Sequence, residues 1–464
     1  MKRLARVAMV LALAFMMAGC ASLPVSSRVH VDDDGSDSRE VRGYAPVDSS
    51  SPERIIEGFF SSMDEGAKDN YALARQYVMA SLVSTWNPQE KIYVYASDEK
   101  MRISQQSDGS FSFDIPIIGT LEENGVFTWE ANKENSHATF SLGKNSAGQW
   151  RIISAPHAVW ISQSTLEEYF LSMPIYFMSS SRTHMVADMR LFHKDVVKES
   201  AVRAVLTQSK NYWLNSALSI VDEEMSLSSQ GIDVQEGCAY VHMSSSFASV
   251  SQDKRLIVFA SLKRTLMEFE DINDVVLTIE GNELADMPVD DIYMNDTPVK
   301  SQLYGVTTSG ELLSIDAGNS HIVGSVDSSS IVVPSYDVAS RGYAVMPKDG
   351  TSIHLFRTSG ERAVVFDGAT WAKPTFDSSG WLFTVHRHGD GRIYFSSPQG
   401  AKGNVSLPWI SGREVKNISM SPDGSRLIVV IEENGSDEMY AFSLERSPLM
   451  TPKSFGEAHR IGHG

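Results

Sequence analysis

The chain has 464 residues, of which 42% are hydrophobic and 21% are charged, a composition typical of folded protein at a length that allows about three domains. The formal net charge of -18, without any run rich in lysine and arginine, excludes a nucleic-acid-binding face, because phosphate recognition depends on clustered basic side chains. With only two cysteines, Cys20 and Cys238, the sequence offers neither a disulfide framework nor a cysteine-based metal site.

The N-terminus is predicted to be a signal peptide that leads into a lipid-attachment cysteine. Positive charges precede an uncharged apolar run over residues 7–17, which is too short to cross a bilayer as a helix. Ala18 and Gly19 then precede Cys20, a pattern that resembles the bacterial lipobox. We therefore expect residues 1–19 to be removed and Cys20 to carry an S-diacylglycerol and an N-acyl chain. The alternative is an ordinary signal peptide in which Cys20 has no role.

Residues 20–50 are predicted to form a flexible linker, because Ser, Asp, Gly and Arg dominate them and apolar residues are too few to build a core. Aspartates at 32–34 and 37 lack the alternating spacing of a calcium-binding loop. Acyl chains on Cys20 would hold the folded part of the chain on the extracytoplasmic face of the cell membrane.

Residues 51–160 are predicted to contain two helices followed by a sheet. Ser51 can cap the first helix, Pro52 suits its first turn, and apolar residues over 55–63 follow helical spacing. A second helix is predicted over 71–78. Alternating patterns between Gly and Asn turns then predict strands at 92–95, 111–117, 126–129, 138–142 and 150–153. This α+β arrangement resembles the cone-shaped NTF2 type, a class that includes both enzymes and ligand-binding domains.

Residues 161–300 are predicted to form a second α+β domain. In chain order, the pattern predicts a strand at 175–178, a return strand at 185–187, a helix capped by Asp195, a hairpin at 232–243, a helix from Asp253 and a strand at 275–279. Cys238 lies in the hairpin, where it is predicted to be a small buried residue rather than a reactive thiol.

Residues 301–446 carry short β runs and a recurring turn. Gly342, Gly380 and Gly424 each precede an apolar run, at intervals of 38 and 44 residues, a period typical of β-propeller blades. With an earlier unit at 304–315 we expect about four blades; a β-sandwich without a true repeat is the alternative. Residues 447–464 show little strand pattern and are predicted to be a tail.

Several blocks of this sequence resemble the LpqB family of actinobacterial lipoproteins. Beside the lipobox, they are the helix at 51–59, which reads Ser-Pro-Glu-Arg-Ile-Ile-Glu-Gly-Phe, and the segment from Pro174 to Leu206. The blocks at 262–266 and 276–281 are similar to the GerMN domain. The resemblance implies a C-terminal β-propeller, although this family's propeller is usually longer than the region available here, so a small, incomplete or truncated propeller is expected.

The resemblance also implies a function. It is that of a non-enzymatic, membrane-anchored accessory, which binds the extracellular sensor domain of a histidine kinase and modulates two-component signalling in cell-wall and cell-division homeostasis. The alternative is a glycan-binding module or cell-wall-processing enzyme that contacts cell-wall material through the NTF2-like domain or the propeller.

The residues themselves carry little catalytic chemistry, and no catalytic, cofactor-binding or metal-binding residue is predicted. Phosphate-binding glycine motifs, a G-x-S-x-G elbow and an H-E-x-x-H helix are absent from the sequence. The strongest groups of acid, base or aromatic side chains are His386, Arg387, His388 and Asp390; His459 and His463; Glu167 and Glu168; Glu268, Glu270 and Asp271; and the tryptophans Trp150, Trp160, Trp213 and Trp371. We interpret the first four as surface or tail features and the tryptophans as packing residues.

Overall fold

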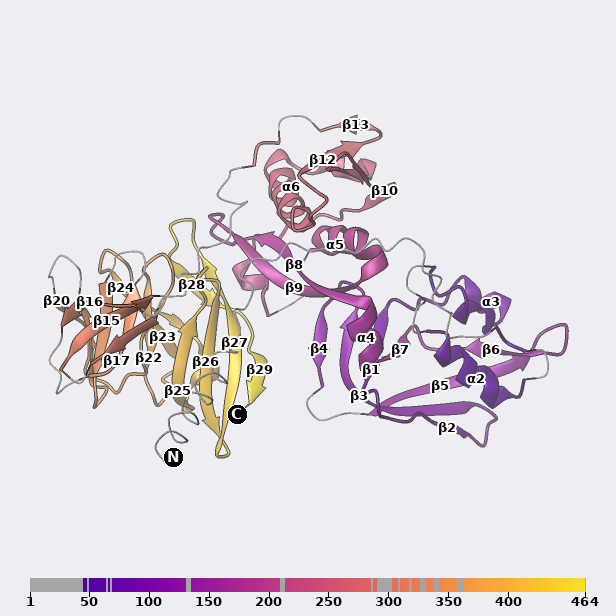
Figure 1. Ribbon diagram of the computed structural model, residues 1–464, viewed down its shortest axis with the longest axis horizontal. Coiled ribbons are helices and arrows are strands. Elements are labelled where there is room, and N and C mark those ends of the chain that lie inside the picture. The colour runs from indigo at the N-terminus through magenta and orange to yellow at the C-terminus, as the bar shows by residue number, and fades with distance from the viewer. Residues whose placement is uncertain are drawn as a thin grey trace, which may run out of the picture.

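The computed structural model describes residues 45–47, 50–63, 66, 69–130, 135–208, 213–284, 287–289, 303–307, 309–316, 319–325, 331–337, 342–356 and 362–463. Cys20, the signal peptide and most of the expected linker lie outside these residues. The described chain forms three units, which we name the N-terminal unit (52–169), the middle unit (170–284) and the C-terminal unit (303–463) (Figure 1).

The N-terminal unit begins with helix α2 (Pro52–Ser61), as the sequence predicts. The Ser51 hydroxyl accepts a hydrogen bond from the Arg54 N–H at 3.5 Å, and Pro52 occupies the first turn. The predicted second helix is wrong, because only a short 3-10 turn, η2 (Ala74–Gln76), and helix α3 (Ala80–Val83) form there. Bonds of Tyr77 and Met79 with Ile152 draw this backbone into the edge of the sheet instead.

A curled seven-stranded sheet wraps around α2 (Figure 1). Its main path runs β6-β5-β3-β1-β7, and β2 and β4 pair with opposite ends of β3. The strands are β1 (Lys91–Tyr95), β2 (Arg102–Gln105), β3 (Phe111–Glu122), β4 (Phe127–Trp129), β5 (Asn135–Lys144), β6 (Trp150–Ser154) and β7 (Val159–Ser162). Aromatic side chains of α2 and the sheet fill the core, with Phe60 and Phe113 stacked at 4.2 Å between ring centres. Leu166 of α4 (Gln163–Tyr169) belongs to the same core, which therefore continues past residue 160.

The middle unit follows the predicted order of strand, strand, helix, hairpin, helix and strand. Its elements are β8 (Phe170–Met178), β9 (Met185–His193), η3 (Lys194–Val196), α5 (Val197–Leu206), η4 (Asn215–Ala217), β10 (Leu227–Gln235), β11 (Cys238–Met243), η5 (Ser245–Ser249), α6 (Gln252–Leu266), β12 (Asp274–Ile279) and β13 (Asn282–Glu283). Helix α6 crosses from β11 to the parallel strand β12. The prediction that Asp195 caps α5 is wrong: Val196 stands at that position without a side-chain bond, and Asp195 lies in η3.

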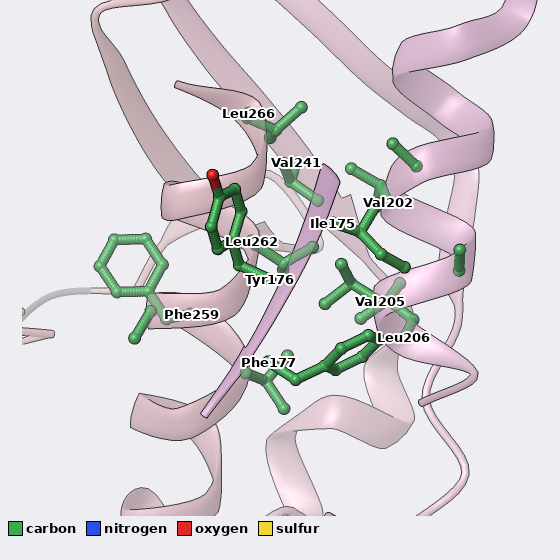
Figure 2. Packing of buried hydrophobic residues seen from close by; sticks show 14 of the residues in the cluster. Ile175, Tyr176, Phe177, Val202, Val205, Leu206, Val241, Phe259, Leu262 and Leu266 are labelled. Atoms are coloured by element: carbon green, nitrogen blue, oxygen red, sulfur yellow. The ribbon is translucent and has the colours of Figure 1, made fainter. Parts of the chain in front are cut away.

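The core of the middle unit is built where β8 passes between its two long helices. Figure 2 shows Ile175, Tyr176 and Phe177 of β8 between α6 and α5. Facing them are Leu262 and Leu266 of α6, and Val202 and Val205 of α5, all essentially buried. Each such side chain contributes about 1.5–3 kcal/mol by leaving water, so this layer fixes the hairpin of β8 and β9 firmly on the helices.

The C-terminal unit consists of four consecutive antiparallel sheets (Figure 1). Their strands are β14 (Leu303–Val306), β15 (Glu311–Asp316) and β16 (Asn319–Ser325); β17 (Ile331–Asp337), β18 (Gly342–Pro347), β19 (Ser352–Phe356) and β20 (Arg362–Asp367); β21 (Thr375–Phe376), β22 (Leu382–Val385), β23 (Arg392–Ser396) and β24 (Lys402–Ser406); and β25 (Glu414–Met420), β26 (Arg426–Glu433), β27 (Ser436–Arg446), β28 (Pro452–Phe455) and β29 (His459–His463). The first strand of each sheet contacts the first strand of the next, the arrangement of propeller blades.

Two details of this unit differ from the sequence prediction. Residues 447–464 are not a tail without strands, because β28 and β29 both pair with β27 and complete the last sheet. Gly380 and Gly424 adopt the positive φ that their turns require, at +82° and +70°, whereas Gly342 is the first residue of β18. Residues 452–463 show little strand pattern of their own, and they form strands because β27, which precedes them closely in the chain, offers its backbone groups as partners.

Candidate functional site

The hairpin of β8 and β9 contacts both other units and is the structural centre of the molecule (Figure 1). At the open end of the hairpin, Arg190 of β9 donates a hydrogen bond to the Asn124 carbonyl of the N-terminal unit at 2.7 Å. The Leu191 N–H donates to the Gly125 carbonyl at 2.9 Å. These bonds join two backbones that are more than sixty residues apart, so they fix the hairpin against the turn between β3 and β4.

Arg190 is a charged residue held inside this junction. Its side chain is fully buried, and it donates two hydrogen bonds to the Asp188 carboxylate, at 2.6 and 2.9 Å. Asp188 and Arg190 are two residues apart on β9 and therefore share one face of the strand. A buried guanidinium is tolerated only when its charge and its N–H groups are satisfied, which is the case here.

Gly125 makes the close approach of the two units possible. It has φ +82°, a conformation that other residues rarely adopt, and a Cβ at this position would lie 2.5 Å from the Phe192 ring and 3.1 Å from the Arg190 Cβ. Any larger residue would push β9 away from the turn. Glycine is therefore required at this position for two reasons: it adopts the positive φ, and it leaves room for the Phe192 ring.

The turn of the same hairpin, at residues 179–184, docks on the last sheet of the C-terminal unit. The His184 Nε2 lies 3.1 Å from the Ser425 hydroxyl, and the Arg446 N–H donates to the Ser180 hydroxyl at 3.0 Å. Arg426 also donates a hydrogen bond to the Ala187 carbonyl. Polar groups of each surface bond to polar groups of the other, so these bonds fix how the two surfaces align.

Burial and neighbouring charges set the ionisation of this contact. Burial lowers the pKa of His184 below its ordinary value, and Asp423 only partly opposes that shift, while Arg446 and Arg426 add to it. Burial alone would raise the pKa of Asp423, but Arg426, the Ser421 hydroxyl and the Ser425 N–H outweigh it and hold that pKa below its usual range. At neutral pH the interface therefore contains a neutral imidazole beside an ionised carboxylate.

An aromatic stack extends the same interface. The indole of Trp213, next to η4, stacks on His459 of β29 with ring centres 5.0 Å apart and an angle of 9° between planes. Arg426 lies over the Trp213 ring at 5.8 Å. Burial lowers the pKa of His459, which favours the neutral ring in the stack. His459 is therefore a packing residue at the interface, and the expectation that it lies in a tail is wrong.

A buried ion pair connects the last two sheets of the C-terminal unit directly beneath this interface. Arg446 donates to Asp377 at 2.6 Å, and both side chains are at most 2% exposed. Its other N–H groups donate to the carbonyls of Gly424 and Met450, at 3.0 and 2.8 Å. Burial lowers the pKa of Arg446 and raises that of Asp377, as expected for charges removed from water.

Part of the predicted group around His386 lies close together in the structure, where its side chains pack on neighbouring aromatic rings. His386 stacks on Tyr394 at 4.9 Å and meets the edge of Trp371 at 4.4 Å, while the Tyr394 hydroxyl donates to Asp390 at 2.6 Å. The pKa of Tyr394 is raised by its partial burial and by that bond. His388 points elsewhere, to Glu414 at 2.7 Å. Arg387 lies at 4.0 Å from the same Glu414, so the four residues do not converge on one point.

The acidic candidates do not form a cleft. Glu167 accepts a hydrogen bond from Gln163 one turn earlier on α4, and Asp271 pairs with Lys198. Glu268 pairs with Arg264, whose guanidinium lies over the Tyr176 ring at 4.0 Å. Glu168 is exposed, and its backbone carbonyl accepts a bond from Lys194. Glu167 and Glu168 lie on α4, whereas Glu268 and Asp271 lie in the turn after α6, an arrangement unlike the paired acids of a glycosidase.

The remaining candidates have structural surroundings. Trp160 is buried and donates to the Ser136 hydroxyl at 3.0 Å. Trp150 is half-buried against the N-terminal core, with Lys144 over its ring. Cys238 begins β11 and is half-buried rather than fully buried as predicted. His463 pairs through its backbone with Glu438 of β27.

Within the described parts of the chain, no group of three or more His, Cys, Asp or Glu side chains could hold a metal ion. The helices described there are also too short or too polar to cross a membrane. The charged groups of the two junctions are bonded to one another, so their chemistry is that of contact between domains. The fold and its junctions define a multidomain, strand-rich protein in which one hairpin contacts both outer units.

Comparison with known proteins identifies the family of this chain. Family models match residues 45–167 as the N-terminal domain of lipoprotein LpqB, 174–285 as the "Sporulation and spore germination" (Germane) domain, and 310–464 as the LpqB β-propeller domain. The chain belongs to the LpqB family of lipoproteins. The predicted fold class, two α+β domains followed by a β-propeller-like domain, is confirmed.

Relatives agree along most of the chain. Lipoprotein LpqB of Bifidobacterium longum is 24% identical over 89% of this chain and 73% of its own length, and that of Cutibacterium acnes is 23% identical over 93% and 77%. The first GerMN domain of the sporulation protein GerM from Bacillus subtilis matches 26% of this chain and 90% of its own length, at 19% identity and a TM-score of 0.21.

Proposed function

We propose that this lipoprotein is a non-enzymatic accessory that binds the extracellular sensor domain of a histidine kinase and modulates two-component signalling. Membership of the LpqB family supports an anchored, extracytoplasmic role. The kinase as partner is what the family resemblance implies. Cys20, with its lipobox, is the proposed site of the S-diacylglycerol and N-acyl anchor.

The observation that carries this proposal is the two-ended hairpin. Its turn is fixed to the C-terminal unit through Ser180 and His184, and its open end to the N-terminal unit through Arg190. Rigid elements that hold several domains in one geometry present an extended, preorganised surface, and preorganisation lowers the entropic cost of binding another protein. The charged side chains inside these junctions are occupied with one another, which supports binding rather than catalysis.

The test is recovery of the kinase from membranes that contain the tagged, lipidated full chain. The membranes are solubilised in detergent, the tag is captured, and a sensor histidine kinase is identified by mass spectrometry. A matched control carries the same tag on residues 1–50 alone, so it shares the anchor and linker and lacks the folded units. A version that ends near residue 300 asks whether the C-terminal unit carries the contact.

Enrichment of one sensor kinase by the full chain over the anchor control supports the proposal. Equal recovery by both proteins refutes it, because the anchor alone would then explain the association. Retention of cell-wall fragments without a kinase would favour the alternative of a glycan-binding module or cell-wall-processing enzyme.

A further inference from the structure

Strand β4 is an open edge of the N-terminal sheet with two aromatic side chains on it. It pairs with β3 on one side, with Trp129 opposite Gly119 and Phe127 opposite Leu121. Within the described residues, no strand pairs with its other side. In Figure 1, β4 is the strand of this unit that lies nearest to the C-terminal unit, below the β8–β9 hairpin.

The direction of the backbone groups on β4 follows from its hydrogen bonds. The Glu130 N–H donates to the Ile118 carbonyl at 2.9 Å, and the Glu122 N–H donates to the Val126 carbonyl at 2.9 Å. Because hydrogen-bonded pairs alternate along an antiparallel ladder, Thr128 also faces β3. Phe127 and Trp129 must then point their N–H and C=O groups away from the sheet. Those groups have no bonding partner in the parts of the chain that the structure describes.

The side chains of Phe127 and Trp129 form a short aromatic strip on one face of this edge. Their ring centres lie 4.9 Å apart at 86°, and Trp129 is 67% exposed. Phe127 lies over the backbone of Gly119, and a Cβ at that position would overlap the phenyl ring. The absence of a side chain at Gly119 therefore lets Phe127 pack directly on the sheet. An indole exposed to this degree, beside free backbone groups, is the combination that an added β-strand can use.

Acidic residues surround the strip on both sides. Glu122 ends β3, Glu123 follows it in the turn to β4, and Glu130 comes directly after β4. Across the described ranges, none of these three carboxylates takes part in an ion pair. Of the features that protect edge strands, β4 has short length, but it carries no lysine, proline or bulge. The acidic flanks instead repel strands that carry negative charge, including β4 of a second copy of this chain.

We propose that the β4 edge binds an extended peptide segment of another protein, rich in lysine or arginine that alternates with apolar residues, by adding it as a strand. The partner's backbone bonds to the free groups of Phe127 and Trp129, its apolar side chains pack on the indole, and its cations face the three glutamates. This site is proposed independently of whether the partner is a kinase.

The probe is a fluorescent peptide of about eight residues with lysine at alternate positions and valine or tyrosine between them. An otherwise identical peptide with glutamate in place of lysine tests charge, and one with a central proline tests strand addition. Binding to the full chain in detergent is measured by fluorescence anisotropy, and hydrogen exchange is followed at residues 127–130. We expect the lysine peptide to bind at least about tenfold more tightly than either relative and to slow exchange at Phe127 and Trp129.

Matched variants distinguish binding at the β4 edge from nonspecific binding of the peptide. Trp129→Ala should weaken the lysine peptide at least about tenfold, whereas Ile153→Ala, which removes an exposed apolar side chain from β6 of the same unit, should leave binding within about twofold. Glu122→Lys combined with Glu123→Lys should reverse the preference between the two charged peptides, whereas Glu57→Lys, on the exposed face of α2, should not. Circular dichroism confirms that each variant is folded.

Equal affinity for the two charged peptides, or an unchanged affinity in Trp129→Ala, overturns the proposal. So does a concentration-dependent dimer that Trp129→Ala abolishes, because the edge would then belong to a second copy. Protection of 127–130 in the full chain without peptide, lost when residues 21–43 are deleted, would assign the edge to the chain's own linker and also overturns it. Because the kinase pulldown does not use these peptides, either proposal can fail without the other.

Discussion

Replacing Arg446 by methionine should be the most damaging single change in the C-terminal unit. The substitution removes the bond to Asp377 and two bonds to the carbonyls of Gly424 and Met450, and it keeps most of the apolar volume of the side chain. Asp377 then remains buried with only the N–H groups of Ser379 and Trp381, both at 2.9 Å. Leaving one member of a buried ion pair without its partner costs about 3–5 kcal/mol.

A second substitution tests whether the cost comes from the stranded charge. Asp377→Asn in the Arg446→Met background removes the negative charge and keeps the amide oxygen that accepts from Ser379 and Trp381. We expect the double variant to recover about 2 kcal/mol relative to Arg446→Met, because replacing both partners avoids an uncompensated charge. Asp377→Asn alone should also destabilise the C-terminal unit, because the buried Arg446 guanidinium would lose its negatively charged partner.

Native-state hydrogen exchange is the suitable assay, because a chain of several domains has no single unfolding free energy. Protection is measured in β22, which follows the turn that contains Asp377, in β27, which carries Arg446, and in α2 as an internal control in the N-terminal unit. Loss of less than about 1 kcal/mol of protection in Arg446→Met, or a double variant as unstable as the sum of the single ones, would refute the reasoning.

Three further predictions concern the hairpin and the anchor. Gly125→Val should destabilise the junction by about 1–3 kcal/mol and raise hydrogen exchange at Leu191, because a side chain strains φ +82° and collides with Phe192. Gly148→Val, on an open turn of the same unit, tests the φ strain alone. The pKa of docked His184 lies below that of a free imidazole, near 6.5, so an undocked ring binds a proton first as the pH falls. Hairpin docking should therefore weaken below about pH 6.5. His184→Gln should remove this pH dependence from the exchange protection at residues 179–184. Cys20→Ala should move the protein from the detergent phase to the aqueous phase in phase partitioning, and an unchanged distribution would contradict acylation at Cys20.

Much of the fold was predictable because its signals are local. Ser51 and Pro52 mark the start of α2, and the alternation around Gly237 predicts the β10–β11 hairpin. The order of elements in the middle unit follows from apolar periodicity alone, since each element must bury one face in the same core. Intervals between turns such as those at Gly380 and Gly424 similarly indicated four sheets.

The errors arose where pairing with another segment decides the local structure. Helical spacing over 71–78 competes with bonds from Ile152, and the sheet wins. Residues 452–463 become strands only because β27 offers both of its ends as partners. The junctions were not predictable at all, because Arg190, His184 and Arg446 resemble ordinary surface residues until the units meet. Their long, polar side chains gave no periodic signal.

The two ends of the β8–β9 hairpin resist separation for different reasons. At the open end, the buried Arg190 would have to return to water together with Asp188, and the steric fit at Gly125 would be lost. At the turn, undocking would expose Trp213 and His459, while Arg446 would lose one backbone bond but keep its pair with Asp377. The junction with the C-terminal unit should therefore open first, and it is the one whose strength depends on pH. A partner that contacts both outer units would bind most tightly while this junction is closed, and it would stabilise the closed state by its difference in affinity for the two states.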